Sequence, residues 1–456
     1  MGNRRDFVKK TALSTAGIVL GSSVFSAKSY ANILGANDRV VLGSVGIGGR
    51  GKGLLNSFSG MYDKGVRIKT ICDVDTKFFA ERTKMSAKNQ KGNKPGVETD
   101  MRNVFDDQDI DAVVVATPNH WHALSTIWAC QAGKHVYVEK PSSHNIWEGR
   151  KMVEAARKYN RVVQVGFQNR SISKVMQAME FLHNGGIGEV FMARGTCFKP
   201  RNSFGIAQDS APPSTLDYDK WLGPANYRAY NEKKGHYNWH WDTGNGDTGN
   251  QGPHQFDVAR WGLNKNVHPV KVQSMGGIFG VTKEECSQET PNTQTSSFEY
   301  EDGKILEFET RGRFTNAESH AGIKIGNMFY GTEGWLEVNG STWKAYKNSE
   351  KEPFAGSGMG TGAAVGGDTS FRTAPDSDGH FANFITGVKS GNRLDVNCDV
   401  EVGHMSTVLP LIANIAYKTG ETLRFNGEFE NFIDNEAADL MLTRRYRYPY
   451  VVPQNV

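Results

Sequence analysis

The stretch that decides the fold is Val40-Val41-Leu42-Gly43-Ser44-Val45, followed at once by Gly46-Ile47-Gly48-Gly49-Arg50-Gly51. The apolar run predicts a strand that is covered on both faces, and the glycines match the GxGxxG pattern. In that pattern the first glycine permits a tight turn, the second lets the backbone approach a pyrophosphate, and the third lets the helix pack on the strand. The phosphates then lie at the positive end of the helix. The sequence therefore predicts a Rossmann domain that binds a dinucleotide.

A carboxylate follows the next predicted strand at the distance expected for a ribose contact. The run from Val66 to Cys72 ends at Asp73, twenty-two residues after Gly51. An acid in this place accepts the ribose hydroxyls and repels a 2′-phosphate, which favours NAD over NADP. Asp75 is the second candidate, although it could equally cap a helix. A nearby arginine tolerates a phosphate, so Arg50 keeps NADP as the less favoured alternative.

Two later strands bring polar side chains to the same edge of the predicted sheet. They run from Asp111 to Ala116 and from His135 to Val138, with a helix expected over 123–132. Ligands of open parallel sheets bind at the carboxyl ends of the strands. We therefore expect the following side chains to face the crevice: Asn119, His120 and Lys140.

Length and composition bound the class of protein. A chain of 456 residues exceeds what one hydrophobic core supports, and we expect a Rossmann domain over 37–166 and an α/β substrate and oligomerisation domain over 167–456. The net charge is only +4, which disfavours nucleic acid as a partner, and no apolar run is long enough to span a membrane. Five cysteines lack CxxC spacing. His120 and His122 have no carboxylate or cysteine partner in register, so we expect no metal.

The first residues have the parts of an export signal. Arg4 and Arg5 precede a mildly apolar run from Ala12 to Ala27 and then small residues, an order typical of secretory signals. The adjacent arginines resemble the twin-arginine signal. We expect an export signal over 1–31 and a periplasmic protein. Because no dinucleotide pool exists there, an exported enzyme would have to hold its cofactor tightly.

The second half of the chain predicts helices and an antiparallel sheet. An amphipathic helix is expected over 173–183 and further helices from His380 and over 405–418. Segments 190–196, 270–275, 295–301 and 304–310 alternate between apolar and polar residues, as in a sheet with one exposed face. The Gly-rich segment 356–367 predicts a mobile surface loop.

These pieces together resemble the glucose–fructose oxidoreductase, inositol dehydrogenase and MocA (Gfo/Idh/MocA) family. The motifs that carry the resemblance lie in order along the chain: Gly46–Gly51, Cys72–Asp75, Ala116–His122, Glu139–Pro141, His254–Trp261, Gly403-His404 and Tyr446–Pro449. The resemblance implies a Rossmann domain followed by an α/β domain with a large, open, mostly antiparallel sheet. It also implies an NAD(P)-dependent oxidoreductase that forms homo-oligomers.

The resemblance also implies a catalytic set. Family members use the lysine of the Glu-Lys-Pro motif and an Asp-x-x-x-His pair, which points to Lys140 and His254. Asn250 stands where the family has the aspartate, so it can orient a hydroxyl but cannot take a proton. Asp247 is one turn away and could substitute for it. A histidine near its ordinary pKa of about 6.5 suits the removal of a hydroxyl proton.

Substrate and cofactor contacts complete the expected site. An aromatic and polar stretch that includes Trp221 and residues 236–242 suits a sugar, which offers flat apolar faces and many hydroxyls. The expected substrate-binding residues are Lys140, Arg201, Asn202, Trp239, Asn250 and His254. The expected cofactor-binding residues are Gly46, Gly48, Gly49, Arg50, Gly51, Asp73, Thr117, Pro118, Asn119, His122, Glu139 and Lys140.

Three functions fit these observations. The first is hydride transfer from a sugar, glycoside or related polyol. The second is a glycoside hydrolase that uses tightly held NAD for transient oxidation and elimination; such enzymes resemble this chain but depart from Glu-Lys-Pro, which is intact here. The third is a periplasmic sugar-binding protein with a vestigial dinucleotide site, which the intact glycines, Asp73 and Lys140 disfavour.

Overall fold

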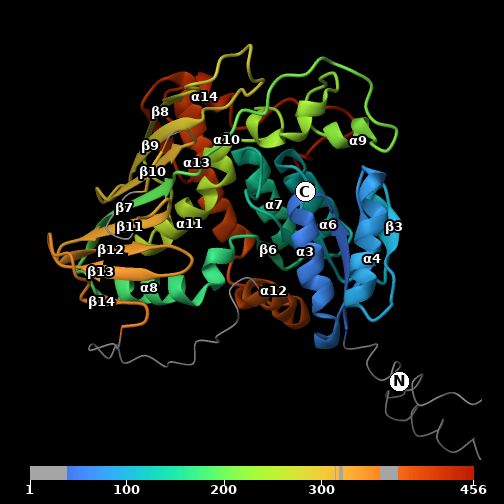
Figure 1. Cartoon of the computed structure of the whole chain (residues 1–456), viewed down its shortest axis with the longest axis horizontal. Helices are drawn as coiled ribbons and strands as arrows, with labels where there is room; N and C mark the ends of the chain where they lie inside the picture. The colour runs from blue at the N-terminus through green and yellow to red at the C-terminus, as the bar shows by residue number, and fades with distance from the viewer. Residues whose placement is uncertain (1–38, 314, 318–321, 360–377) are drawn as a thin grey trace, which may run out of the picture. The chain divides into compact units, whose positions relative to one another are not determined.

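Two sheets organise the computed structural model, which describes residues 39–313, 315–317, 322–359 and 378–456. Figure 1 shows the second sheet on one side and the first sheet, with α3, α6 and α7, on the other. The expected export signal and most of the expected Gly-rich loop lie outside the described residues. Within the described part, no helix combines the length and apolarity that crossing a bilayer requires.

The first sheet is the expected Rossmann sheet. Its strand order is β3-β2-β1-β4-β5-β6 with every neighbouring pair parallel, which is the order of dinucleotide-binding folds. Its strands are β1 (Val40–Val45), β2 (Val66–Cys72), β3 (Gly96–Glu98), β4 (Ala112–Val115), β5 (His135–Val138) and β6 (Val163–Val165). Its helices are α3 (Gly49–Gly60), α4 (Phe79–Asn89), α5 (Met101–Asp106), α6 (Asn119–Gln131) and α7 (Ile146–Lys158).

Alternate residues of β4 face two different cores. Val113 and Val115 pack with α6 and α7, whereas Val114 packs with α3 and with α12 (Asp378–Ser390). The C-terminal residues Tyr450 and Val452 also join the core on the α6 side. Late parts of the chain therefore complete both faces of the first sheet, which explains why β4 is apolar along its whole length.

The second sheet has ten strands in the order β14-β13-β12-β11-β7-β10-β9-β8-β15-β16. It is antiparallel except for the parallel pair β7 and β10, so the expected mostly antiparallel sheet is confirmed. Helices α8 (Ser173–His183), α11 (Gly252–Gly262) and α13 (Val400–Thr419) share its apolar core. The strands are β7 (Val190–Cys197), β8 (Lys271–Gly277), β9 (Thr293–Glu299), β10 (Ile305–Arg311), β11 (Ile325–Gly331), β12 (Gly334–Val338), β13 (Trp343–Tyr346), β14 (Ala355–Gly356), β15 (Leu423–Asn426) and β16 (Asn431–Phe432).

Two helices begin earlier than the sequence predicted. Helix α6 begins at Asn119 rather than at residue 123, directly after Pro118, so the polar residues expected in a loop form its first turn. Helix α13 begins at Val400 rather than at residue 405, because the side chain of Asp399 caps it by accepting from the backbone N–H of Glu401. Expected strand ends differ from the structure by no more than two residues.

The buried carboxylate of Glu430 connects α7, α13 and the segment that precedes β8. Glu430 Oε1 lies 3.0 Å from His268 Nε2, 2.7 Å from His404 Nε2 and 2.7 Å from Arg150 Nη2. Burial raises the pKa of Glu430, but these three hydrogen bonds outweigh burial and the net pKa shift is downward. The ionised carboxylate is therefore the form that the fold stabilises.

Glu430→Gln is expected to lower the free energy of unfolding by about 1–3 kcal/mol at neutral pH, because Arg150, His268 and His404 then face a neutral amide instead of a buried carboxylate. A carboxylate whose folded pKa is depressed contributes stability above its unfolded pKa of about 4.3 and loses that contribution as the pH falls. Urea titrations at pH 7 and pH 4 should therefore show a smaller pH dependence in the variant. Glu401→Gln is the control, since this exposed partner of Arg150 should cost less than about 1 kcal/mol.

Candidate active site

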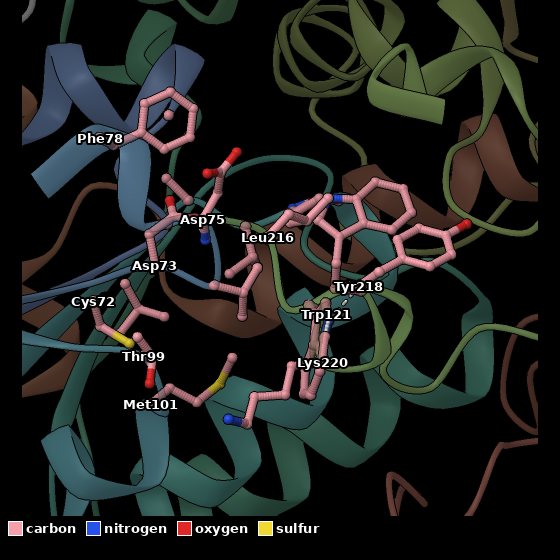
Figure 2. Close-up of a pocket in the computed structure, with 18 of the residues that line it drawn as sticks. Cys72, Asp73, Asp75, Phe78, Thr99, Met101, Trp121, Leu216, Tyr218 and Lys220 are labelled. Atoms are coloured by element: carbon pink, nitrogen blue, oxygen red, sulfur yellow. Dashed lines mark hydrogen bonds between the residues drawn. The ribbon is translucent and has the colours of Figure 1, made fainter. Parts of the chain in front are cut away.

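A cleft of about 350 Å³ lies at the carboxyl ends of β1, β2 and β4. Figure 2 shows Asp73 and Asp75, which follow β2, on one side and Leu216, Tyr218 and Lys220 from the second half of the chain on the other. The expected cofactor residues that line the cleft are Gly46, Gly48, Gly49, Arg50, Asp73, Thr117 and Pro118.

The glycines of the first turn leave the room that a pyrophosphate needs. A Cβ on Gly51 would lie 1.8 Å from the carbonyl oxygen of Gly46, and Gly46 has a φ of +77°. Gly49, by contrast, meets nothing within 4 Å. Helix α3 begins at Gly49 with no side-chain cap and no acidic residue in its first turn. The turn is therefore tightly packed at Gly46 and Gly51 and unobstructed at Gly49. The first N–H groups of α3 have no side-chain cap and lie at the positive end of the helix. These two features fit a pyrophosphate.

Asp73 is held in place by the turn that it faces. Its Oδ2 accepts from the backbone N–H of Ile47 at 2.8 Å, and its Oδ1 accepts from that of Asp75 at 3.0 Å. Burial raises the pKa of Asp73, and the two backbone hydrogen bonds oppose that shift. Asp75 instead pairs with Lys77 and lies in a backbone bridge with Leu216. Of the two acids, Asp73 is the one placed to accept ribose hydroxyls.

Arg50, which lines the cleft, forms an ion pair with Glu139. Arg50 Nε donates to Glu139 Oε1 at 3.0 Å, and the same oxygen accepts from Gln168 Nε2 at 3.0 Å. Gln168 also donates to the hydroxyl of Tyr137 at 2.7 Å. Glu139 is nearly buried, so the ion pair neutralises it. Arg50 is thus engaged by a carboxylate, which weakens the case for a 2′-phosphate partner.

Lys140 joins the first domain to Asn250, the last residue of α10 (Gly246–Asn250). Its Nζ donates to the backbone carbonyl of Asn250 at 2.7 Å and lies 3.4 Å from Asn250 Oδ1. Asn250 Nδ2 in turn lies 3.5 Å from Asp247 Oδ1. Burial lowers the pKa of Lys140, which the negative charge of Glu139 partly offsets. A lysine of this kind loses its proton more readily than a free one.

Asp247 forms an ion pair with an arginine. Arg201 contacts both of its oxygens, at 2.9 Å through Nε and 2.6 Å through Nη2, and Asp247 is buried. The guanidinium of Arg201 also lies 5.4 Å from the ring centre of Trp239. The structure therefore brings together Lys140, Asn250, Asp247, Arg201 and Trp239, whereas Asn202 is exposed.

His254, in the first turn of α11, lies beside this group and differs from the expectation in one respect. Burial, followed by the positive charge of Lys140, holds the pKa of His254 well below its ordinary value. The histidine is therefore not near pKa 6.5, as the sequence led us to expect. A neutral imidazole beside a lysine can orient a hydroxyl, but with a lowered pKa it is a weak proton acceptor.

Three residues expected at the crevice are buried in the first turn of α6. The two ring nitrogens of His122 lie 2.6 Å from the carbonyl oxygen of Pro141 and 2.8 Å from that of Thr117. Those of His120 face the carbonyl oxygens of Thr243 and Trp221. Asn119 is also buried and does not line the cleft. The two histidines thus bridge backbone segments.

A strap that the sequence did not reveal covers the dinucleotide cleft. We use this name for residues 215–223. The backbone N–H of Thr76 donates to Thr215 at 2.9 Å and that of Asp217 donates to Val74 at 2.9 Å, so the strap is fixed to the turn after β2. Trp221, which suggested a sugar contact, lines the dinucleotide cleft instead. No local signal could have placed these residues over a strand so distant in sequence.

The C-terminal tail holds the strap from the other side. Arg447 Nε donates to the carbonyl oxygen of Gly223 at 3.0 Å. Tyr450 lines the cleft and its ring packs edge-on against Trp121, with 5.3 Å between ring centres. The cleft is therefore enclosed by parts of the chain that come from both ends of the second domain.

A second cavity, of about 220 Å³, is lined in part by His254 and by no residue of the dinucleotide turn. Most of its polar lining consists of amides from the segment after β6, from α11 and from β11 and its neighbours. Its polar side chains are Gln168, Asn169, Gln251, His254, Gln255, Asn327 and Asn339. Gln168 connects this cavity to the Arg50–Glu139 pair described above.

In the described part of the chain, His268, His404 and Glu430 form the one cluster with metal-ligand spacing. Glu430 already receives Arg150, and both Nδ1 atoms of the histidines are buried without a partner. Metal binding through Nε2 would place the imidazole hydrogens on these orphaned Nδ1 atoms, which is costly. The tautomer with hydrogen on Nε2 satisfies Glu430 instead, so the cluster fits a hydrogen-bonded lock better than a metal site.

The fold and site together define a dinucleotide-binding enzyme of two domains. The chain matches the family model of the Gfo/Idh/MocA oxidoreductases with an NAD-binding Rossmann fold over residues 41–167. It matches the C-terminal alpha/beta domain of the same family over 197–329 and 367–452. The chain therefore belongs to the Gfo/Idh/MocA oxidoreductase family.

Relatives include enzymes of two kinds. Levoglucosan dehydrogenase of Pseudarthrobacter phenanthrenivorans is 40% identical over 98 residues, which are 22% of this chain and 25% of that protein. A glycosyl hydrolase family 109 protein of Solibacter usitatus is 34% identical over 155 residues, 32% of this chain and 35% of that protein. The matches thus span only about a quarter to a third of these relatives' length.

A solved structure of levoglucosan dehydrogenase in complex with NADH and levoglucosan resembles the whole described fold. The TM-score is 0.61 at 19% identity, and the match covers 85% of this chain and 99% of that chain. At this identity the likeness concerns the fold.

Proposed function

We propose that this protein is an NAD-dependent oxidoreductase that removes hydride from a CH–OH group of a sugar, glycoside or related polyol. The observation that carries the proposal is the contact of Lys140 with Asn250, the last residue of α10. Lys140 Nζ lies 2.7 Å from the carbonyl oxygen of Asn250, four residues before His254. Lys140, as a proton acceptor, and His254, as a group that orients a hydroxyl, therefore lie near each other beside the dinucleotide cleft.

The chemistry follows from the charges of these groups. A carbinol carbon loses hydride only as its hydroxyl proton is removed. Lys140, in its neutral form, takes that proton on Nζ, and burial makes the neutral form more accessible. Neutral His254 orients the hydroxyl, and Asn250 positions Lys140. Bound NAD supplies the hydride acceptor.

The direct test is the absorbance of reduced nicotinamide after sugars are added to the dinucleotide-loaded protein. A rise with sugars that have a free CH–OH group supports the proposal. Dinucleotide that remains oxidised with every sugar, glycoside and polyol of a broad panel would rule it out.

We also propose that the enzyme is exported to the periplasm and keeps its cofactor between turnovers. The strap supports retention of the cofactor, because release of a dinucleotide from under the strap would break the Thr76–Thr215 and Asp217–Val74 backbone hydrogen bonds. Denaturing the purified, extensively dialysed protein should release about one dinucleotide per chain. Leu216→Gly should let the cofactor dialyse away faster, and complete loss from the wild type would contradict retention.

Asp73→Ser is expected to reduce the preference for NAD over NADP by tenfold or more. The variant removes the carboxylate that a 2′-phosphate would meet, while a serine can still hydrogen-bond the ribose. Titrating the protein freed of dinucleotide with NAD and with NADP gives the ratio of Kd values. Asp63→Ser is the control, because this exposed acid is outside the cleft; an unchanged ratio in Asp73→Ser would remove Asp73 from cofactor selection.

A second candidate is a glycoside hydrolase that uses transient oxidation and elimination. The family 109 relatives favour it. It predicts release of phenol from aryl glycosides with no net reduction of dinucleotide. Net reduction without phenol release favours the oxidoreductase.

We propose further that the protein forms homo-oligomers, as its family resemblance implies. Exposed apolar side chains on the second sheet support this: Phe191, Met275 and Ile305. Light scattering coupled to gel filtration measures the molecular mass. A mass of one chain at micromolar concentration would contradict the proposed homo-oligomer.

A further inference from the structure

Asn250 lies between a cation and an anion, and this fixes the orientation of its side-chain amide. Its Oδ1 faces Lys140 Nζ at 3.4 Å, and its Nδ2 faces Asp247 Oδ1 at 3.5 Å. A protonated lysine can only donate hydrogen bonds, and an ionised carboxylate can only accept them. A flipped amide would turn its N–H groups toward the ammonium and its oxygen toward the carboxylate, so both contacts would be repulsive. The favoured orientation therefore has the amide oxygen on Lys140.

Arg201 completes this chain of side chains at the end opposite Lys140. It contacts both oxygens of Asp247, at 2.6 Å and 2.9 Å, and the side chain of Asp247 is only 2% exposed. The backbone N–H of Arg201 donates to the carbonyl oxygen of Gly312 at 2.8 Å, which fixes the base of the arginine side chain. A buried carboxylate without a paired cation is costly, and burial favours its protonated form. Arg201 therefore keeps Asp247 ionised, so that both of its oxygens accept.

The two ends of the chain also act on Lys140 through their charges, with opposite signs. Burial has the largest effect on the pKa of Lys140 and lowers it. The charged side chains that modify this pKa are Glu139 and Asp247, which raise it, and Arg50 and Arg201, which lower it. His254 beside them is neutral, because burial and Lys140 hold its pKa well below the ordinary value. Removing one partner of the Arg201–Asp247 pair therefore leaves an unbalanced charge near the amine.

We propose that Arg201 and Asp247 are positioning residues for Lys140: they act through Asn250, hold its amide oxygen on the amine, and balance each other's charge beside it. The inference rests on the proposed function for the importance of Lys140 as the base. The orientation and ionisation of the amine, however, can be measured without turnover.

The pH dependence of kcat/KM in two variants tests the proposal. Arg201→Gln leaves Asp247 uncompensated, which favours the charged amine, so the fall of kcat/KM at low pH should move up by about half a pH unit or more. Asp247→Asn leaves Arg201 uncompensated, which favours the neutral amine, so the fall should move down by a similar amount. A general loss of packing would not shift the two profiles in opposite directions.

Two further variants separate charge from shape. Arg201→Lys keeps the positive charge and should restore most of the shift that Arg201→Gln causes. The double variant Arg201→Gln with Asp247→Asn removes both charges, and its profile should return close to that of the wild type. A double variant that shifts as far as Arg201→Gln alone would overturn the proposal, because the two residues would then not act as a pair.

The amine itself is observed by NMR on dinucleotide-loaded protein that carries ¹³C at the lysine Cε atoms. The signal of Lys140 is the one missing from Lys140→Met, and its midpoint on titration with acid should shift as the kcat/KM profiles do. This measurement needs no substrate. Opposite shifts of the signal in a protein whose dinucleotide no sugar reduces would contradict the proposed function and leave the positioning of Lys140 standing.

Arg157→Gln is the matched control. Arg157 of α7 also pairs with a largely buried carboxylate, that of Asp399 before α13, and this pair lies outside the chain from Arg201 to Lys140. Its loss should leave the pH profile and the Lys140 signal unchanged. Shifts in the same direction for Arg201→Gln and Asp247→Asn, or an equally large shift in Arg157→Gln, would overturn the proposal.

Discussion

Lys140→Met is expected to lower kcat by about 10²–10⁴-fold, the range that a general base contributes. Methionine keeps the length and the apolar stem of lysine but has no amine to accept the hydroxyl proton. Lys140 does not line the dinucleotide cleft, so the dinucleotide content should stay the same. The measurement is kcat together with the amount of dinucleotide released by denaturation.

The pH dependence of the wild type gives an independent readout of the same residue. Only the neutral amine accepts a proton, so kcat/KM should fall as the pH is lowered through the pKa of Lys140. Burial lowers that pKa, and the transition should lie below the value of about 10.4 for a free lysine. Lys88→Met, on the exposed surface of α4, is the control. Full activity in Lys140→Met would assign the base to another group.

Gly51→Ala is expected to abolish most dinucleotide binding, with a loss of affinity of tenfold or more. The added Cβ would lie 1.8 Å from the carbonyl oxygen of Gly46, so the backbone of the turn has to move. Displacements of this kind cost about 1–3 kcal/mol or more, and they separate the N–H groups at the start of α3 from the phosphates. Titration with NAD and thermal unfolding both measure the effect.

Gly53→Ala is the matched control on the same helix. Its Cβ would meet only the end of the Arg50 side chain, at 3.9 Å, and the position is exposed. Alanine is favoured over glycine inside a helix by up to about 1 kcal/mol. The control should bind NAD normally and unfold at an equal or higher temperature. Equal NAD affinity in both variants would show that the turn is not the phosphate site.

The sequence predicted the features that depend on neighbouring residues. The strand–glycine–helix unit at residues 40–60 is local, because its glycines and apolar residues specify turn and strand directly. Asp73 could be predicted for the same reason, because it directly follows the apolar residues of β2. The parallel order of the first sheet came from a repeated strand–helix pattern, which admits few other topologies.

The features that the sequence could not predict depend on packing between residues far apart in the chain. Tyr218 and Tyr450 reach the cleft from segments far from β1, and no periodicity reports such a contact. The pKa of His254 depends on burial and on Lys140, more than a hundred residues away in sequence. His122 was expected to bind the cofactor, but α6 begins at Asn119 and the two ring nitrogens of His122 face backbone carbonyls.

The whole account depends on where a dinucleotide sits, and a crystal structure of the NAD complex measures that directly. We predict diphosphate oxygens within hydrogen-bonding distance of the backbone at residues 48–50, a ribose on Asp73, and the adenosine half beneath the strap. NAD seated at another place, or Gly48 and Gly49 covered by protein side chains in the complex, would contradict the account.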